Sequence, residues 1–476
     1  MMIPEFKIRS IAGVRKLRST LRTGCASFRQ SESGAMSYVA IAGAMILMVF
    51  GGAGIDMIST ELKRNKIQST LDRAVLAAAD LEQVLDPEDV VTDYMDKMNL
   101  GDALNDVRVD HGLNYKRVTA DASVTTPTNF MSLIGIENMQ AKGAAQAEEK
   151  IAKVEISMVL DISGSMAENN KLRNLRSAAD TFVDTVLNDN TKDLISISLV
   201  PYSEQVNAGP LITEQMNVDW KHGYSHCLEF PDSQFNSTVL NTSMTYEQMQ
   251  HFQWNYSGSN DRTDTVCPRY NYERIAPFSQ NATALKNQIA QFQPRAGTSI
   301  FMGMKWGTAL LDPSTRGIAT GLINSGSMDA EFSGRPVNYD DTETLKTVVL
   351  MTDGQHDRSF RIQDWAYNSS SEVAQWERYN LWYYLARYVR SSSHSSFYTQ
   401  KYNANLGDSL LDNICDAAKE KGIVIWSIGF EVSDHGADVM KNCASSASHF
   451  FRVEGTEIED AFYSIARAIN QLRLTQ

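Results

Sequence analysis

Three short segments of the sequence place oxygen-bearing side chains where they could bind a divalent cation. The first is Asp161-Ile162-Ser163-Gly164-Ser165, in which one carboxylate and two hydroxyls alternate along a chain that Gly164 allows to turn tightly. Hard oxygen ligands of this kind suit Mg²⁺, or Mn²⁺ in its place. Alone the segment is weak evidence, because Asp and Ser are common in turns and this turn could simply cap the helix that follows.

Two later segments supply the remaining ligands. Thr298 offers a hydroxyl in the loop before a predicted helix, and Asp353 offers a carboxylate directly after a predicted strand. Because doubly wound sheets bind ligands at the carboxyl ends of their strands, we predict a single metal site. Its ligands are Asp161, Ser163, Ser165, Thr298 and Asp353. We expect them at a loop surface, where the two carboxylates repel each other until a cation binds.

The elements that position these residues alternate between strands and helices from Ala152 onward. Apolar runs typical of buried parallel strands lie at 154–160, 194–200, 344–351 and 423–430, with a short strand at 449–453. Helices are predicted at 169–188, 281–293, 300–311, 408–421 and 457–472. The alternation predicts an α/β domain over residues 151–476, built on a doubly wound, mostly parallel sheet. Residues 203–280 and 355–407 lack this periodicity and are predicted to be long insertions.

With these elements in place, the sequence resembles the von Willebrand factor A family. The metal-ion-dependent adhesion site (MIDAS) of that family combines a D-x-S-x-S loop with a later Thr and a later Asp. The five predicted ligands match these positions in order. The resemblance implies a Rossmann-like fold, bound Mg²⁺ or Mn²⁺, and an open metal position for an acidic group of a protein partner. It implies binding without turnover, and we expect no enzymatic activity because no nucleophile lies in a recognisable elbow.

Two other clusters are interpreted structurally. His356 and Asp357 closely follow Asp353 and are expected at the rim of the metal site, without a catalytic role. The aromatic residues between Trp376 and Tyr388 have helical spacing, so we predict that they form a packed helix face.

The N-terminus has the charge pattern of a membrane anchor. Residues 1–30 contain seven basic side chains and one acidic side chain, whereas the whole chain has a net charge of −13. The acidic body disfavours nucleic-acid binding. The 22 residues from 34 to 55 carry no charge and are numerous enough to cross a bilayer as a helix. Because the basic flank stays cytoplasmic, we predict a cytoplasmic tail at 1–33, a transmembrane helix at 34–55 and an extracytoplasmic remainder. A cleaved signal peptide is the alternative.

The segment between the membrane helix and the α/β domain divides in two. Residues 57–85 are rich in helix formers, and the helix that they predict should end at Asp86-Pro87. Residues 88–100 suggest a second helix. We therefore expect a helical stalk over 56–104. Residues 105–150 alternate apolar and polar positions, which predicts a small β-rich module and linker.

The five cysteines fit this topology. Cys25 precedes the membrane helix and is expected to remain a free thiol. Cys227, Cys267, Cys415 and Cys443 follow it, where disulfides form. Of the three possible pairings we favour 227 with 267 and 415 with 443, because each pair lies in one local segment. The neighbouring His222, His226 and His251 leave a zinc site as an alternative.

Both ends of the chain resemble TadG-like proteins of the Tad/Flp pilus machinery. The similar segments are GAMSYVAIA, KIQSTLDRAVLAAA and the C-terminal stretch from CDAAKEKGIVIWSIGF to AFYSIARAINQLRLTQ. The resemblance implies a single-pass protein of the bacterial inner membrane whose A domain lies in the periplasm. Its expected role is the assembly or anchoring of a pilus or a surface adhesion system. A pilin-like structural subunit and a von Willebrand A protein of another envelope complex are the alternatives.

Overall fold

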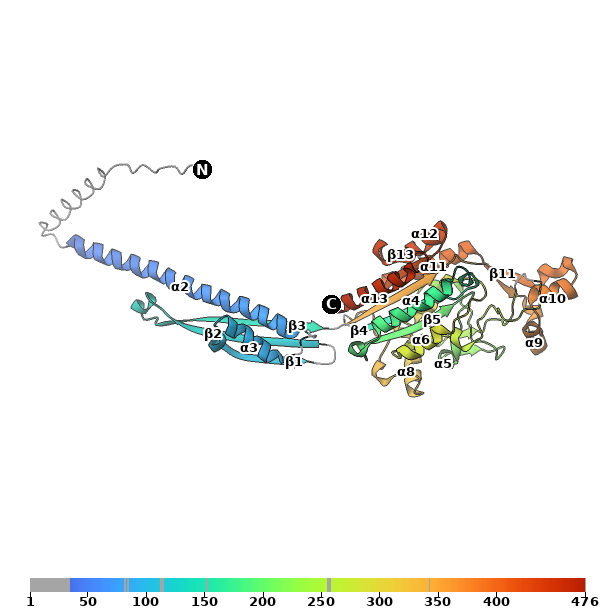
Figure 1. Ribbon diagram of the computed structural model, residues 1–476, viewed down its shortest axis with the longest axis horizontal. Helices are drawn as coiled ribbons and strands as arrows, with labels where there is room; N and C mark the ends of the chain where they lie inside the picture. Colours follow the sequence, from blue (N-terminus) through green and yellow to red (C-terminus); the bar gives the residue numbers. More distant parts are fainter. Residues whose placement is uncertain are drawn as a thin grey trace, which may run out of the picture. The chain divides into compact units, whose positions relative to one another are not determined.

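The computed structural model describes residues 35–80, 83, 85–111, 115–150, 153–254, 258–341 and 343–475. The expected basic tail at 1–33 and its Cys25 lie outside these residues. The chain divides into two compact units, Met1–Glu149 and Lys150–Gln476, each with its own hydrophobic core (Figure 1).

The N-terminal unit packs three strands and a short helix against one long helix. The long helix is α2 (Ala35–Ala79) and the short one is α3 (Pro87–Lys97). The sheet has the order β1 (Leu104–His111), β2 (Tyr115–Pro127) and β3 (Asn138–Lys150). Alternate residues of β2 face the helices, so Val118 and Ala120 pack in one core with Leu71 of α2 and Val91 of α3. The stalk and the β-rich segment therefore share a single core.

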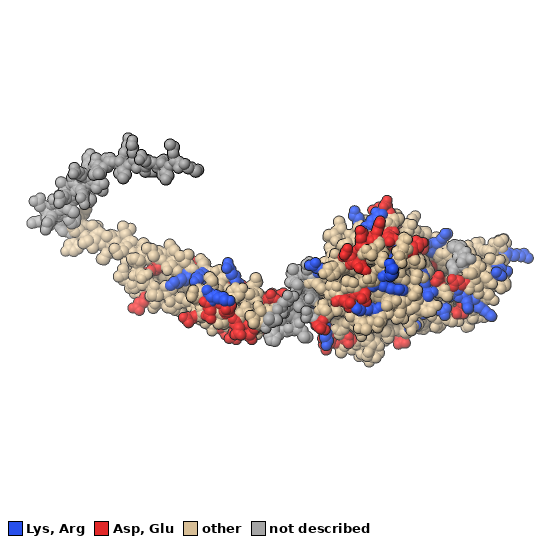
Figure 2. All heavy atoms as spheres, in the orientation of Figure 1, with Lys and Arg blue, Asp and Glu red and all other residues tan. Residues whose placement is uncertain are grey.

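Helix α2 runs without a break through the predicted membrane segment and into the predicted stalk. Among the described residues it is the one helix long and apolar enough to cross a membrane. Its first part is exposed and uncharged (Figure 2), whereas Ile67 and Val75 further along are buried against the sheet. The helix ends at Ala79, so it is shorter than the predicted helix, which continued to residue 85. Asp86 and Pro87 instead begin α3, where Asp86 is the N-cap and Pro87 occupies the first turn.

The C-terminal unit is built on a six-stranded sheet of order β13-β12-β9-β4-β5-β8. Its strands are β4 (Lys153–Asp161), β5 (Ile195–Tyr202), β8 (Ala276–Ser279), β9 (Thr344–Thr352), β12 (Val424–Phe430) and β13 (Phe450–Val453). The strands from β13 to β5 are parallel, and β8 pairs antiparallel with β5 at one edge. The predicted doubly wound, mostly parallel fold is therefore confirmed.

Helices cover both faces of this sheet (Figure 1). One core contains the apolar sides of α4 (Lys171–Val186), α6 (Ala282–Ala290) and α13 (Glu457–Thr475). The other contains those of α7 (Ile300–Ala309), α8 (Arg316–Asn324), α11 (Ala404–Glu420) and α12 (Asp434–Cys443). The central strand β4 contributes side chains to both cores, since Met158 packs in the first core and Val159 in the second. This two-sided burial explains why consecutive apolar residues follow one another from Met158 to Leu160.

The two predicted insertions have structure of their own. Residues 203–280 contain α5 (Gly209–Thr213) and a small sheet of β6 (Asn217–Asp219) and β7 (Thr245–Glu247), and then return to the main sheet as β8. Residues 355–407 contain the paired strands β10 (Ser359–Ile362) and β11 (Tyr398–Tyr402), and the helices α9 (Ser370–Arg378) and α10 (Leu381–Tyr388). Both segments contribute to one hydrophobic cluster, which includes Phe252 from the first and Trp376 from the second. They therefore pack together, although they are distant in sequence.

The aromatic run between Trp376 and Tyr388 forms two helices. The chain breaks at Asn380, whose side chain accepts hydrogen bonds from the Trp382 and Tyr383 N–H groups of α10. Trp376 of α9 and Leu385 of α10 are buried, and the Trp376 ring packs edge-on against Tyr384. The run is thus a packed face, as predicted, but it is divided between two elements.

Both favoured disulfides are present, Cys227–Cys267 and Cys415–Cys443. The first lies in the cluster shared by the two insertions, and the second joins α11 to α12. His222 Nε2 lies 2.9 Å from Met249 O, and burial lowers the pKa of His222 to about 4. Among the described residues, no group of three or more His, Cys, Asp or Glu side chains could hold a metal ion. The zinc alternative therefore has no support.

Candidate metal centre

The two predicted carboxylate ligands leave adjacent strands of the central sheet. Strand β4 ends at Asp161, and Asp353 directly follows β9. The strands are parallel neighbours, with Leu160 opposite Met351, so both chains leave the sheet at the same end. The parallel register therefore brings together two side chains that are 192 positions apart in the sequence.

Short hydrogen bonds join four of the five predicted ligands. Asp161 Oδ1 accepts a hydrogen bond from the Ser163 N–H at 2.8 Å. The Ser163 and Ser165 Oγ atoms lie 3.1 Å apart, and Ser165 Oγ donates to Asp353 Oδ1 at 2.6 Å. The second oxygen of Asp161 accepts from Thr352 Oγ1 at 2.7 Å. Oxygen atoms from both strand ends thus converge on one point.

Thr298 is brought near this point by the loop that carries it. Its loop is attached to the D-x-S-x-S segment, because the Arg295 N–H donates to Ile162 O at 2.9 Å and the Gly164 N–H donates to Ala296 O at 3.0 Å. Thr298 is buried. Among the described residues, however, no hydrogen bond joins its hydroxyl to the other four ligands. The loop is therefore attached to the site, although the Thr298 hydroxyl makes no hydrogen bond to the other ligands among the described residues.

The site is more buried than expected. Asp161 and Ser163 are 0% exposed and Asp353 is 4% exposed, whereas Ser165 is partly exposed. The expectation of a loop-surface site was therefore wrong, because the sheet core extends to the last residues of β4 and β9. Burial, together with the nearby charge of Asp353, raises the pKa of Asp161.

Lys171 belongs to the site and was missed from the sequence. It is the first residue of α4, and its Nζ lies 3.0 Å from Asp353 Oδ2, with both side chains buried. A lysine at the start of a helix has no distinctive spacing, so nothing in the sequence pattern pointed to it. The ammonium offsets part of the carboxylate charge.

The donor set fits a small, hard cation. Its side chains offer only oxygen atoms, two carboxylates and three hydroxyls, and this is the chemistry that Mg²⁺ and Mn²⁺ prefer. One carboxylate already has an ammonium partner, which leaves the other as the main uncompensated negative charge. When bound, the metal would supply a positive centre that accepts a further oxygen ligand.

His356 was expected at the rim of the site, but the structure does not place it there. It is buried, and its Nε2 accepts a hydrogen bond from the Phe301 N–H at 3.2 Å. Nδ1 therefore carries the proton and donates to Asp408 Oδ1 at 2.8 Å. Asp357 is exposed, and its N–H donates to Thr298 O at 2.9 Å. His356 thus fixes the start of α7, and only Asp357 occupies the rim.

A cavity of about 260 Å³ adjoins the metal-binding loops. Its lining residues are Gly164, Ala296, Gly297, Glu204, Trp254, Asp264 and Asp357. Glu204 is buried and accepts hydrogen bonds from Trp254 Nε1 and Ser359 Oγ. Burial raises the pKa of Glu204 to about 7. The space beside the metal site is therefore bordered by carboxyl groups and one indole ring.

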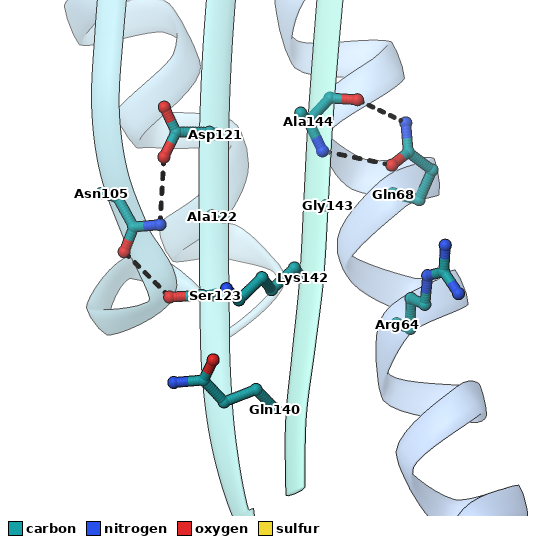
Figure 3. Close-up of a pocket in the computed structure, with 10 residues that line it drawn as sticks. All are labelled: Arg64, Gln68, Asn105, Asp121, Ala122, Ser123, Gln140, Lys142, Gly143 and Ala144. Carbon is teal, nitrogen blue, oxygen red and sulfur yellow. Dashed lines mark hydrogen bonds between the residues drawn. The ribbon is translucent and has the colours of Figure 1, made fainter.

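A second hollow, of about 440 Å³, lies in the N-terminal unit beside α2 and the sheet (Figure 3). The Gln68 side chain bonds to both the N–H and the C=O of Ala144, and Asn105 bonds to Asp121 and Ser123. Because these polar groups are paired with one another, we assign this hollow no ligand.

The parallel sheet, the helices on both faces and the D-x-S-x-S loop at the end of its central strand define a domain of the von Willebrand factor A type. Residues 34–81 match the family described as putative Flp pilus-assembly TadE/G-like. This match lies in the N-terminal segment that resembles TadG-like proteins, and it supports the recognition expected from the sequence, a TadG-like chain with a von Willebrand factor A domain.

Solved structures with similar folds include the vWF domain of the type V pili tip protein Mfa5 from Porphyromonas gingivalis. Identity is 15% and the TM-score 0.36, over 67% of this chain and 96% of that one. The pilus adhesin SpaC from Lactobacillus rhamnosus GG is 12% identical, with a TM-score of 0.36 over 77% of this chain and 33% of that one. Proximal thread matrix protein 1 from the mussel byssus, with a zinc-occupied MIDAS motif, is 12% identical. Its TM-score is 0.29, over 66% of this chain and 46% of that one. No curated protein matches the sequence significantly.

Proposed function

We propose that the chain is a membrane-anchored protein that binds a divalent cation and uses it to bind a partner without catalysing a reaction. Mg²⁺ or Mn²⁺ would be held by Asp161, Ser163, Ser165, Thr298 and Asp353, and an acidic side chain of the partner would complete its coordination. The binding would serve the assembly or anchoring of a Tad/Flp-type pilus or a surface adhesion system. The convergence of carboxylate and hydroxyl oxygens at the ends of β4 and β9 carries the proposal.

The charge balance favours an acidic partner. The two ligand carboxylates would bring two negative charges to the metal, and Lys171 offsets one of them. A divalent cation in this set keeps an excess of positive charge, which attracts another carboxylate. Gly164 is exposed and Ser165 is partly exposed, which gives that group a route to the metal, whereas Asp161 and Ser163 are buried.

The proposed location is the bacterial inner membrane, with the N-terminus in the cytoplasm and the A domain in the periplasm. The uncharged residues 34–55 and the basic flank before them support this orientation. The two disulfides support an oxidising compartment for the C-terminal unit.

Calorimetric titration of Mg²⁺ and Mn²⁺ into residues 150–476 tests the metal site. The wild type should bind, and Asp161→Ala and Asp353→Asn should lose most of the affinity because each removes a charged ligand. Glu155→Gln is the matched control, since Glu155 is also a buried carboxylate paired with a lysine, Lys346, but lies near the start of β4. Equal affinity in the wild type and Asp161→Ala would refute the site.

A pilin-like structural subunit is the second candidate, favoured by the exposed apolar start of α2, which could pack within a fibre. Shearing of cells followed by fractionation separates the two. An assembly or anchoring protein stays with the membrane, whereas a subunit is released with the fibres. A von Willebrand A protein of another envelope complex would stay in the membrane, and its deletion would leave pili intact.

A further inference from the structure

The loop between β2 and β3 (residues 128–137) is fixed to α2 just beyond the uncharged segment. Asp56 is 4% exposed, and its carboxylate accepts hydrogen bonds from three successive backbone N–H groups. The donors are Asn129 at 3.1 Å, Phe130 at 2.8 Å and Met131 at 2.9 Å. Three bonds to one carboxylate hold the loop at a defined level of the helix.

The Phe130 ring lies directly on the helix backbone. A Cβ atom added at Gly52 would be 2.2 Å from Phe130 Cγ, so only glycine leaves room for the ring at this helix position. The strands that lead to the loop also follow α2, since Lys63 Nζ donates to Thr126 Oγ1 at 3.2 Å. The position of the loop along α2 is therefore set by polar bonds and by packing.

The loop presents apolar side chains to the outside. Leu133 is 68% exposed, Ile134 is 55% exposed and Ile136 is 40% exposed. On α2, Ile55 and Met57, which flank Asp56 in the sequence, are each 58% exposed. A group of exposed apolar side chains usually marks a contact surface.

The level of this surface can be compared with the thickness of a bilayer. Of the uncharged segment, α2 contains residues 35–55, about 32 Å of helix, which is close to the roughly 30 Å of a hydrocarbon core. Asp56 then lies where the helix leaves the hydrocarbon, and the loop that it holds lies at the same depth. The charged residues Glu61, Lys63 and Arg64 follow on the side away from the bilayer.

We propose that Leu133, Ile134 and Ile136 insert into the outer interfacial layer of the bilayer that α2 spans. The inference rests on the proposed membrane anchor and adds a second membrane contact to it. Lipid is the occupant because the loop surface continues the apolar surface of α2 at the depth where that helix meets the interface. Asp56 is tolerated there because three N–H groups satisfy its carboxylate. Two contacts fix the depth and rotation of α2.

The test uses the full chain with Cys25→Ser, reconstituted into vesicles of phosphatidylcholine and phosphatidylglycerol. Ile134→Cys carries an environment-sensitive fluorophore, and Asp89→Cys, exposed on α3, carries it as the matched control. The label at 134 should emit at shorter wavelength and lose intensity to nitroxides attached near the lipid headgroups. The label at 89 should respond only to aqueous iodide. Asp56→Ala should release the loop and reduce the lipid quenching at 134.

Each other outcome contradicts a particular claim. Equal iodide quenching at 134 and 89, in protein that floats with the vesicles, would overturn the insertion. Protein that fails to float would refute the anchor itself. A short-wavelength signal at 134 that disappears on dilution with lipid would assign the surface to a second copy of the chain. Undiminished lipid quenching in Asp56→Ala would overturn the role of Asp56.

Discussion

Lys171 Nζ and Asp353 Oδ2 form a buried ion pair, 3.0 Å apart, inside the candidate metal centre. The pair joins the first residue of α4 to the residue that follows β9. Part of the negative charge is therefore balanced before any metal binds. The expectation that only a bound cation offsets the carboxylates was incomplete, because it left this ammonium out.

Replacing Lys171 with Met should weaken the metal-free protein and strengthen its response to metal. Breaking a buried ion pair costs about 3–5 kcal/mol, and the lost positive charge is one that repels the cation. The increase in Tm on adding Mg²⁺ should therefore be larger than in the wild type, whereas Lys171→Arg should behave like the wild type. Thermal unfolding with and without Mg²⁺ measures this.

Lys346→Met is the matched control for that experiment. Lys346 Nζ lies 2.5 Å from Glu155 Oε2, and both side chains are buried near the other end of the same strands. The variant should lose comparable stability and keep the wild-type response to Mg²⁺. Equal responses in Lys171→Met and Lys346→Met would contradict a role of Lys171 in metal binding.

Ser165→Ala and Thr298→Val should separate hydrogen bonding from metal ligation. Ser165 Oγ donates to Asp353 Oδ1, so its loss should destabilise the metal-free protein by about 1–3 kcal/mol. The Thr298 hydroxyl has no bond to the other four ligands in the described structure, so Thr298→Val should cost under about 1 kcal/mol. Both should weaken metal binding. Urea unfolding in the presence of chelator, followed by calorimetry, checks both claims. An equal stability loss would show that Thr298 is already bonded within the site.

Glu204 should make the stability of the domain fall as the pH rises. Its pKa is raised by burial from 4.5 to about 7, so between these values the folded state holds the proton more tightly than the unfolded state. This contribution is fully present below about pH 4.5 and is lost as the pH passes 7. Relative to the wild type, Glu204→Gln should therefore gain up to about 3 kcal/mol between pH 5 and pH 8. A stability difference that is constant with pH would contradict the raised pKa.

Removing either disulfide should destabilise the C-terminal unit. The bonds close loops with sequence separations of 40 and 28 residues, for which the chain-entropy model gives about 3–4 kcal/mol each. The paired Cys→Ala variants, compared by urea unfolding, measure the two effects. Free thiols at all four positions in unreduced protein would show that the bonds do not form.

Reporter fusions test the orientation. A reporter joined after residue 30 should be active in the cytoplasm, and one joined after residue 90 should be active outside it. The reason is the basic flank, which is retained on the cytoplasmic side. Reporters active on the same side would remove the membrane anchor and, with it, the basis for the inserted loop.

The sequence predicted the parts of the fold whose residues carry a repeating pattern. Strand β4 is buried on both faces, and the prediction placed it within one residue at each end. Strand β8 was missed, because it has four residues and a single antiparallel neighbour. The common cluster of the two insertions was missed as well, since no local pattern indicates that Phe252 and Trp376 pack together.

In the metal site, too, the local features were predicted from the sequence, whereas a contact between distant residues was not. The carboxylates and serines follow from a short motif and from strand ends, which are local features. The Lys171–Asp353 pair spans 182 positions and depends on where α4 begins relative to β9, so it becomes visible only in three dimensions.

The position of β4 in the sheet sets the order in which the domain can form during synthesis. β4 pairs with β5 and β9, and β9 begins only at Thr344. The segment closed by Cys227 and Cys267 is synthesised entirely between the end of β5 and the start of β9. Until β9 follows, one edge of an apolar strand has no partner, and unpaired edges of this kind invite aggregation. The nascent chain is therefore most vulnerable between residues 202 and 344, the interval in which a chaperone would protect it most.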